Sequence, residues 1–156
     1  MRLLVQLVKS ATVTVQDVSV GSIGPGLLIF FGAHVQDSVA DSEQLAEKIS
    51  LLRIFPDSNG KMNLSMVETG ASALIVSQFT LYGDCWQGKR PSFGNAAPPA
   101  LAKELYDSFV SAMKARIKTV ETGVFGESMA VSLVNDGPTT FVIDSKNLHG
   151  TVKGCG

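Results

Sequence analysis

The sequence predicts an α+β protein that forms a single domain of 156 residues. Short apolar runs of strand length occur near both ends and in the middle of the chain, whereas only two stretches carry apolar residues at helical spacing. The resulting order of strands, helix, strands, helix and strands does not alternate as in a doubly wound sheet. Because the sequence shows no internal repeat or linker, we expect one domain.

The N-terminal third is predicted to consist of strands. Residues 3–8 are mostly apolar, and valines alternate with other residues on both sides of Gln16-Asp17, a pattern that predicts a hairpin. The turn has no glycine, the residue that such turns favour, so its type stays open. Residues 27–31 form a continuous apolar run, which is typical of a strand buried on both faces.

The first helix is predicted to begin in the polar stretch 36–42. Leu45, Ile49 and Leu52 recur at helical spacing and would form its apolar face. Ser38 followed by Asp41 resembles an N-terminal cap, although Ser42 competes for that role.

Four further strands and a second helix are predicted in the remainder. The helix runs from about Pro98 to Lys118, and Pro99 suits its first turn. The tail, 145–156, has the weak patterning of a disordered segment, so the predicted domain covers residues 1–144. The strands are predicted at residues 62–67, 73–79, 129–134 and 140–144.

Composition argues against several functions. With a net charge of −1 and 17% charged residues, a nucleic-acid contact would need a local basic patch. Cys85 and Cys155 form neither a disulfide framework nor a metal-ligand spacing, which indicates a cytoplasmic protein. The longest apolar run falls far short of the roughly 20 residues that span a bilayer, so no membrane partner is expected. The low charge and the 45% hydrophobic content favour an oligomer.

Ordinary acid–base catalysis has few candidate residues in this chain. A serine or cysteine nucleophile needs a base within hydrogen-bond distance, and the sequence contains only His34 and His149. His34 follows a predicted buried strand, His149 lies in the tail, and their spacing fits no catalytic template. No cluster of His, Cys, Asp and Glu predicts a metal site, and no glycine-rich loop predicts a bound cofactor.

Two segments instead display backbone groups, and the first comprises Ser77, Gln78, Phe79 and Thr80. It lies where an apolar strand meets a turn, so one interpretation is a strand end whose hydroxyls satisfy the local backbone. Another is an oxyanion hole, in which the amides of Phe79 and Thr80 point at a carbonyl oxygen. A nucleophilic Thr80 is a third interpretation, but no base is evident to activate it.

The second segment runs from Asn135 to Thr140 around Gly137 and Pro138. Gly-Pro is a turn signal, so a hairpin turn is the simplest interpretation. The alternative is a cis Gly137–Pro138 bond, because the cis form of an X-Pro bond costs only about 0.5–1 kcal/mol. A cis bond would turn the carbonyls of Gly137 and Pro138 toward a ligand as acceptors for an ammonium group.

Together, the two segments resemble the hallmarks of the D-aminoacyl-tRNA deacylases, the D-Tyr-tRNA deacylase family. That family has a Ser-Gln-X-Thr segment and an Asn-X-Gly-Pro-X-Thr segment, and both occur here in the same order. The resemblance extends from residue 1 to about residue 144. Further matching stretches are Gly24-Pro25-Gly26, Arg53-Ile54-Phe55, Gly60-Lys61-Met62-Asn63 and Arg90-Pro91-Ser92-Phe93.

The resemblance implies a chiral-proofreading enzyme. Its reaction would be hydrolysis of the ester between a D-amino acid and the 3′-terminal adenosine of tRNA. The amides of Phe79 and Thr80 would form the oxyanion hole, while Ser77 and Gln78 would shape the adenosine end of the site. Met129 would line the adenine pocket, and the 2′-hydroxyl of the substrate would replace a protein base.

The resemblance also implies a barrel-like, strand-rich mixed sheet and a homodimer with its site at the subunit interface. The motif around Gly137 and Pro138 would reach into the partner's pocket and exclude L-amino acids. Asn135 and Thr139 belong to the same motif. This chain departs from the family at Leu7, where an arginine usually braces the Gly-Pro motif. It also has Thr139 where valine is usual. A looser motif would relax chiral selectivity.

Two alternatives stay open. A related deacylase would act on mischarged glycyl- or L-alanyl-tRNA; Leu7 favours it, whereas Ser77 and Phe79 favour the D-specific branch. A non-catalytic nucleic-acid-binding module would use the irregular stretch 82–99, where basic Lys89-Arg90 stands among aromatic residues. The simplest interpretation of that stretch is a solvated surface loop.

Overall fold

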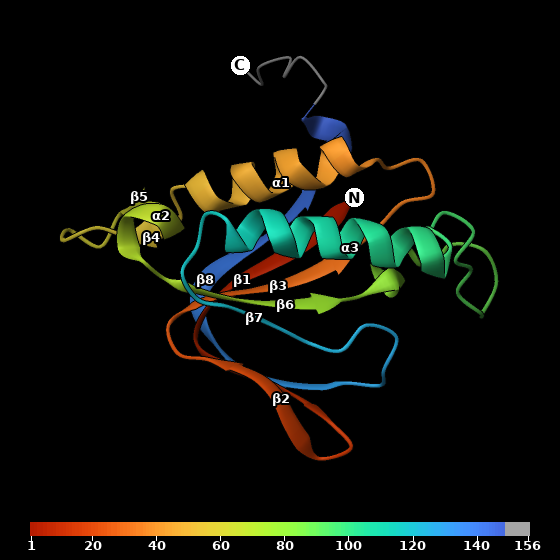
Figure 1. The fold of residues 1–156 in the computed structure, drawn as a ribbon, viewed down its shortest axis with the longest axis horizontal. Helices are drawn as coiled ribbons and strands as arrows, with labels where there is room; N and C mark the ends of the chain where they lie inside the picture. Colours follow the sequence, from red (N-terminus) through yellow and green to blue (C-terminus); the bar gives the residue numbers. More distant parts are fainter. Residues whose placement is uncertain (149–156) are drawn as a thin grey trace.

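The computed structural model describes residues 1–148, and its centre is a six-stranded mixed sheet (Figure 1). The order is β2-β1-β3-β6-β7, and β8 pairs with β1. The pairs β3–β6 and β6–β7 are parallel, and the pairs that β1 makes are antiparallel. The strands are β1 (Arg2–Val15), β2 (Val18–Ile23), β3 (Gly26–Gly32), β6 (Ser72–Ser77), β7 (Val120–Thr122) and β8 (Ala130–Asp144).

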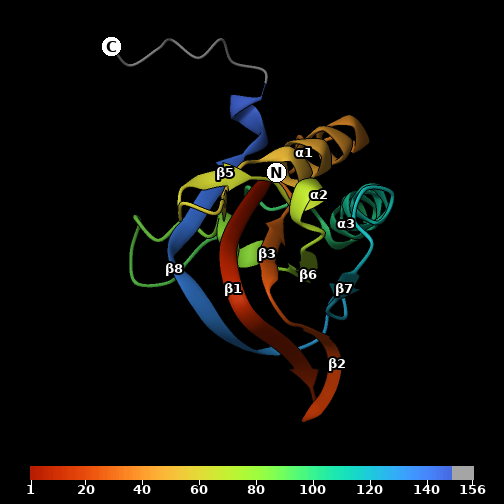
Figure 2. The same ribbon diagram turned by 90° about the vertical axis from the view of Figure 1, so that its left-hand side faces the viewer.

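The sheet curls into a nearly closed barrel, which confirms the barrel-like expectation. β1 and β8 are long strands that curve together, and β2, which pairs with the end of β1, folds back beneath the rest of the sheet (Figure 2). β2 then approaches β7 so closely that a Cβ atom on Gly21 would lie 2.8 Å from the carbonyl oxygen of Thr122. Glycine is therefore required there, because any side chain would push the two strands apart.

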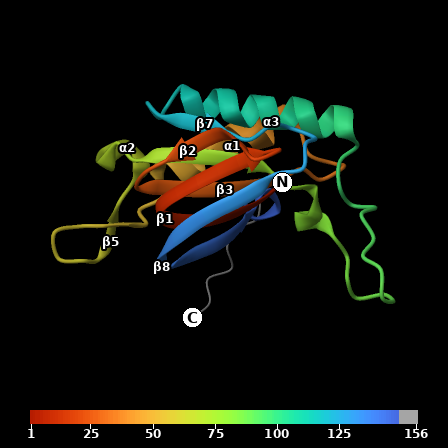
Figure 3. The same cartoon turned by 90° about the horizontal axis from the view of Figure 1, so that it is seen from below.

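The two predicted helices form, and both cover the same face of the sheet. α1 (Val39–Leu51) and α3 (Pro99–Lys114) lie side by side over it (Figure 1), whereas β8 lies along the opposite margin of the molecule (Figure 3). The main core fills the space between helices and sheet, and a second core lies inside the barrel. The largest fully buried side chains include Leu3, Leu27, Ile29, Leu45, Ile49, Ile75, Leu105 and Phe109 in the main core.

Local signals place the turns and helix ends. Gln16 and Asp17 both have positive φ, 49° and 62°, as a two-residue type I′ hairpin turn requires, so the turn forms without glycine. Ser38 is the N-cap of α1, and its N–H and hydroxyl donate to the Asp41 carboxylate at 2.8 and 2.7 Å. The competing Ser42 is instead buried, and its hydroxyl donates to the carbonyl of Leu105 at 3.0 Å.

Two pairs of predicted segments are single long strands. β1 continues through the hairpin arm rather than ending at residue 8, because Lys9 and Ser10 are accommodated by a register shift against β8. The segments predicted as strands 129–134 and 140–144 are one strand, β8, so the hairpin-turn interpretation of the Gly-Pro segment is wrong. Pairing with β1 resumes after Pro138, and the extra residues bulge out.

The strand predicted at residues 62–67 is correct only for its first half. β5 (Met62–Leu64) pairs with the short β4 (Phe55–Pro56), and α2 (Met66–Thr69) then begins. The helix starts because Ser65 is its N-cap and donates its N–H to the Glu68 carboxylate at 2.7 Å. The Ser65 hydroxyl, which donates to the same carboxylate at 2.6 Å, and then this N–H hold the pKa of Glu68 below its ordinary value.

Three further boundaries differ from the predictions. The strand predicted to end at residue 79 ends at Ser77, and a short 3₁₀ helix, η1 (Phe79–Tyr82), follows it. α3 ends at Lys114 rather than near residue 118. A second 3₁₀ turn, η2 (Ser145–Asn147), extends the fold beyond residue 144, and Ser145 donates its N–H to the carbonyl of Met1 at 2.8 Å. The disordered tail predicted for 145–156 is thus wrong for 145–148, and its remainder lies outside the described residues.

No helix in the described range 1–148 is long and apolar enough to cross a bilayer.

Candidate functional site

A cavity of about 650 Å³ opens at the end of β6. Its walls come from the ends of β3 and β6, the start of α3 and the segment that leads into β8. The lining is mostly apolar, and the volume is in the range of small-ligand sites. The lining residues are Phe31, Ala33, Val76, Ser77, Gln78, Phe79, Phe93, Ala96, Ala97, Pro98, Pro99, Ala102, Phe125, Gly126, Glu127, Met129 and Val131.

The first predicted segment forms one side of this cavity. Ser77 is the last residue of β6, and the backbone N–H of Gln78 continues the parallel pairing by donating to the carbonyl of Phe31 at 2.7 Å. The chain then turns into η1, so Phe79 projects at the mouth with 57% of its surface exposed. Ser77, Gln78 and Phe79 line the cavity, whereas Thr80 follows them on the exposed turn.

The turn leaves two backbone N–H groups unused. The first N–H groups of a helix have no partner within it, and Phe79 and Thr80 occupy the first two positions of η1. Among residues 1–148 neither N–H has a hydrogen-bond acceptor, whereas the N–H of Leu81 donates to the carbonyl of Gln78 at 3.3 Å. Two adjacent donors are therefore free to bind a ligand oxygen.

The position of η1 depends on a close contact beneath it. A Cβ atom on Gly32, the last residue of β3, would lie 3.0 Å from the carbonyl oxygen of Gln78 and 3.1 Å from Cβ of Leu81. Only glycine lets the turn pack this tightly on the sheet end. The hydroxyl of Thr80 accepts a hydrogen bond from the side-chain amide of Gln78, which fixes these two side chains relative to each other.

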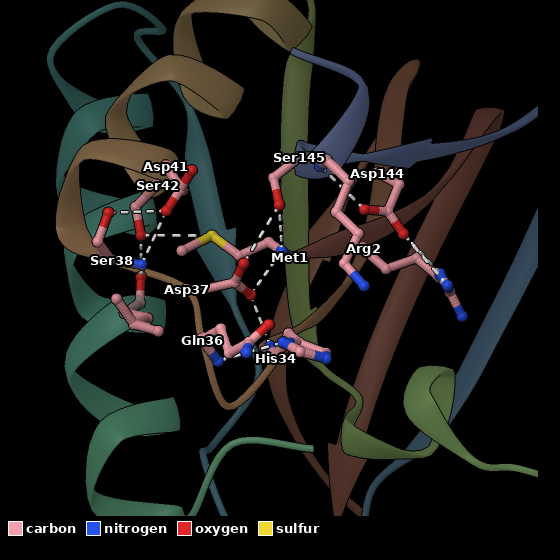
Figure 4. A network of polar contacts seen from close by, with 12 residues as sticks. Met1, Arg2, His34, Gln36, Asp37, Ser38, Asp41, Ser42, Asp144 and Ser145 are labelled. Atoms are coloured by element: carbon pink, nitrogen blue, oxygen red, sulfur yellow. Dashed lines mark hydrogen bonds and ion pairs between the residues drawn. The ribbon is translucent and has the colours of Figure 1, made fainter. Parts of the chain in front are cut away.

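His34 belongs to a structural network rather than to the cavity (Figure 4). Its Nδ1 accepts the N–H of Gln36 at 3.1 Å, and its own backbone N–H donates to the Asp37 carboxylate at 2.6 Å. The ring packs against Tyr82 with centroids 5.2 Å apart. His149 lies outside the described residues, so no histidine of the described chain lines the cavity.

Met129 lines the cavity, and Gly123 determines where it lies. A Cβ atom on Gly123 would be 2.5 Å from the Met129 sulfur, so the thioether fills the space that a side chain would need. Phe125 and Glu127, which lie between these two residues in sequence, also line the cavity and were not predicted. The sequence feature that could have indicated this part of the wall is Gly126, because its φ of 84° turns the segment back toward β8.

The second predicted segment forms a bulge in β8. Gln6 of β1 pairs with Thr140 and Val8 pairs with Asn135, so residues 136–139 all stand opposite Leu7. The Gly137–Pro138 peptide bond within the bulge is cis, as the alternative interpretation predicted. Gly137 and Pro138 are exposed, whereas the Thr139 side chain is buried.

Asn135 braces this bulge. Its side-chain amide donates to the carbonyl of Leu7 in β1 at 2.9 Å and, across the bulge, to the carbonyl of Thr139 at 3.2 Å. Leu7 itself points into the main core, so it contributes through its backbone. None of Asn135, Gly137, Pro138 and Thr139 lines the cavity of the same chain, so the structure does not bring the two predicted segments together.

Within the described residues, no three His, Cys, Asp or Glu side chains gather in a way that could hold a metal ion. The described cysteine, Cys85, is exposed in the loop after η1.

The fold and the cavity define a class: small α+β proteins with a barrel-like mixed sheet and a mostly apolar cavity beside free backbone amides. A family model described as D-Tyr-tRNA(Tyr) deacylase matches residues 4–144. The chain belongs to this D-aminoacyl-tRNA deacylase family, which confirms the predicted family and the predicted enzyme class, a hydrolase.

Relatives cover nearly the whole chain. A D-aminoacyl-tRNA deacylase of Thermosipho africanus is 54% identical over 148 residues, which are 95% of this chain and 99% of the relative. One from Desulfatibacillum aliphaticivorans is 55% identical over 146 residues, 94% of this chain and 100% of the relative.

Solved structures share the fold. A protein described as c-Myc DNA Unwinding Element Binding Protein superposes with a TM-score of 0.86 at 34% identity, covering 92% of this chain and 98% of that one. A probable eukaryotic D-amino acid tRNA deacylase has a TM-score of 0.78 at 17% identity, covering 91% and 98%.

Proposed function

We propose that this protein hydrolyses the ester that joins a D-amino acid to the 3′-terminal adenosine of tRNA, releasing the free amino acid and tRNA. Membership of the deacylase family supports the reaction. The observation that carries the proposal is the pair of unused N–H groups of Phe79 and Thr80 beside a mostly apolar cavity of about 650 Å³. Such donors stabilise the negative charge that develops on an ester oxygen during hydrolysis.

The substrate would lie with its adenosine in the cavity and its ester carbonyl at the η1 turn. Met129 would contact the adenine, and Ser77 and Gln78 would contact the ribose end. A water molecule attacks the carbonyl carbon, the amides bind the oxyanion, and the bond to the ribose oxygen breaks as that oxygen takes a proton. The 2′-hydroxyl of the substrate would relay protons, because the described lining residues include no histidine.

The hydroxyl of Thr80 fits a positioning role better than a nucleophilic role. It accepts a hydrogen bond from the amide of Gln78, whereas a nucleophile needs a neighbouring group that removes its proton. An amide N–H cannot act as that base. We therefore place the backbone of Thr80, and not its side chain, in the reaction.

We propose a homodimer because β8 is an open edge. Within the described chain β8 pairs only with β1, so a 15-residue strand leaves its outer backbone groups without a strand partner. Apolar side chains accompany this edge, including Val134, 53% exposed, and Val142, 65% exposed. Long apolar edges tend to pair with another chain, and a second copy would cover this one.

The dimer would also complete the site. Gly137 and Pro138 are exposed on the β8 edge and are absent from the cavity of their own chain. Placed over the partner's cavity, their carbonyls would accept the ammonium group of the D-amino acid and leave no room for an L side chain. Asn135 and Thr139 would hold this segment in position.

The test compares matched substrates on the purified protein. D-Tyr-tRNA should be hydrolysed far faster than L-Tyr-tRNA, and Gly-tRNA and L-Ala-tRNA serve as the competing substrates. Equal rates with the D and L forms, or no hydrolysis of either, would refute the chiral function. Faster hydrolysis of Gly-tRNA or L-Ala-tRNA would replace it with the related deacylase activity.

The roles of Thr80 and of the 2′-hydroxyl have their own test. The Thr80→Ala variant should keep substantial activity, because the backbone amide stays in place. D-Tyr-tRNA that ends in 2′-deoxyadenosine should hardly react. An inactive Thr80→Ala variant combined with a reactive deoxy substrate would instead identify Thr80 as the nucleophile.

A further inference from the structure

A short hairpin-like loop leaves the cavity mouth after η1, and we call residues 84–92 the finger. Asp84 and Ser92 exchange two backbone hydrogen bonds of 2.8 and 2.9 Å, which close the base of the finger. The Asp84 carboxylate also accepts the N–H of Trp86 at 2.9 Å, and Gly88 turns the chain with a φ of 74°. Figure 3 shows this part of the chain, in green, projecting away from the sheet and helices.

The finger carries an unusual set of side chains for a solvated loop. The indole of Trp86 is 95% exposed, although burying so large an apolar group is normally favourable. Within residues 1–148, the side chains of Lys89 and Arg90 have no hydrogen bond or ion pair. One exposed aromatic face and two uncommitted cations are the groups with which proteins hold single-stranded nucleic acid.

The base of the finger is part of the cavity mouth. Phe93 follows Ser92 directly, and its ring packs edge-on against Phe79 with centroids 5.0 Å apart. Both rings line the cavity, so the finger and the η1 turn share one aromatic contact. Gly83, on the other side of the finger, packs against the same ring, because a Cβ atom there would lie 3.2 Å from it.

We propose that the finger binds the nucleotides that precede the terminal adenosine of the aminoacyl-tRNA. Trp86 stacks on a base of that single strand, and Lys89 and Arg90 contact its phosphates. This inference rests on the proposed function, because a strand whose last nucleoside fills the cavity must leave across the mouth. The four residue steps from Asp84 to Gly88 give the finger a reach of at most roughly 13 Å from the cavity mouth.

A direct binding test needs no catalysis, because Trp86 is the only tryptophan of the chain. Titration of the full-length protein with a short RNA that ends in CCA should quench the Trp86 fluorescence in a saturable way. Lys89→Ala/Arg90→Ala should weaken this binding and reduce its salt dependence by about two phosphate contacts. No quenching, or equal quenching by polyglutamate, would overturn the proposal.

Kinetics separate the finger from the cavity. Trp86→Ala should raise KM for D-Tyr-tRNA by about tenfold, the size of one lost stacking contact. The same variant should hydrolyse D-Tyr-adenosine, which ends before the finger, within about twofold of the wild-type rate. Trp86→Phe should keep most of the affinity for D-Tyr-tRNA, since it retains an aromatic face.

The outcomes distinguish the two proposals. Equal losses on both substrates would show that Trp86 shapes the cavity, and unchanged KM on both would show that it binds nothing; either result overturns the role of the finger. A wild-type protein that hydrolyses neither substrate would refute the proposed function instead. RNA-dependent quenching would then still support the finger as a single-strand contact.

Discussion

The α-ammonium group of Met1 lies 2.5 Å from the carboxylate of Asp37, and both groups are buried. The Ser145 hydroxyl contacts both partners, so the beginning of β1, the loop before α1 and the end of β8 meet at one charge pair (Figure 4). The same carboxylate accepts the backbone N–H of His34. A single buried ion pair thus fastens three segments that are distant in sequence.

We expect Asp37→Asn to destabilise the protein by about 3–5 kcal/mol, because it leaves the Met1 ammonium buried without a counter-charge. Urea denaturation monitored by circular dichroism measures the change. Asp107→Asn is the matched control, since it breaks the exposed Lys103–Asp107 pair and should cost about 0.5 kcal/mol or less. Equal effects of the two variants would show that the Met1 pair is not structural.

Tyr82→Phe should leave stability unchanged or raise it by up to about 1 kcal/mol. The Tyr82 hydroxyl is buried and has no hydrogen-bond partner among residues 1–148. Burial, together with the nearby Asp144 and Asp37 carboxylates, raises the pKa of Tyr82, so the hydroxyl stays neutral at ordinary pH. Removing an unsatisfied polar atom is favourable, and the ring still faces the Arg2 guanidinium. Loss of stability in urea denaturation would indicate a partner for the hydroxyl.

Gly123→Ala should impair substrate binding while leaving the fold intact. Its Cβ atom would displace the Met129 sulfur, a flexible group whose available space is the cavity. We expect KM for D-Tyr-tRNA to rise by about tenfold, with a melting temperature close to wild type. Gly24→Ala is the control, because a Cβ atom there would meet nothing within 4 Å. An unchanged KM would remove Met129 from the adenosine site.

Asn135→Ala should lower the ratio of D-Tyr-tRNA to L-Tyr-tRNA hydrolysis by about tenfold. The variant removes one hydrogen bond that ties the Gly-Pro bulge to β1 and one that spans the bulge to Thr139, each of them worth about 1 kcal/mol. Asp136→Ala is the neighbouring control, because it loses only the exposed 3.9 Å pair with Lys9. If both variants keep the wild-type ratio, the bulge does not govern selectivity.

The sequence predicted the elements whose signals are local. The helical spacing of Leu45 and Ile49, the apolar run of β3 and the Pro99 start of α3 all appear in the structure. Long strands were cut short, because Lys9-Ser10 and Gly137-Pro138 look like breaks when the neighbouring strand is unknown. β7 has only three residues, too few to show a pattern.

The site residues also differ according to whether their signal in the sequence is local or depends on distant segments. Ser77, Gln78, Phe79 and Met129 line the cavity; the first three belong to the Ser-Gln-X-Thr segment, whereas Met129 was named through the family resemblance, and their roles stay predictions. Phe125 and Glu127 were missed because their place depends on how the chain folds back into β8. The Met1–Asp37 pair could not be predicted either, since a terminal ammonium group leaves no side-chain pattern.

β8 runs without interruption from Val131, beside Met129 in the cavity wall, to the exposed bulge at Pro138. In the proposed dimer, one strand would therefore serve the pocket of its own subunit at one end and that of its neighbour at the other. Two alleles, one defective at Met129 and the other defective at Asn135, should then complement each other. Each mixed dimer would regain one intact site, which neither mutant could assemble with copies of itself.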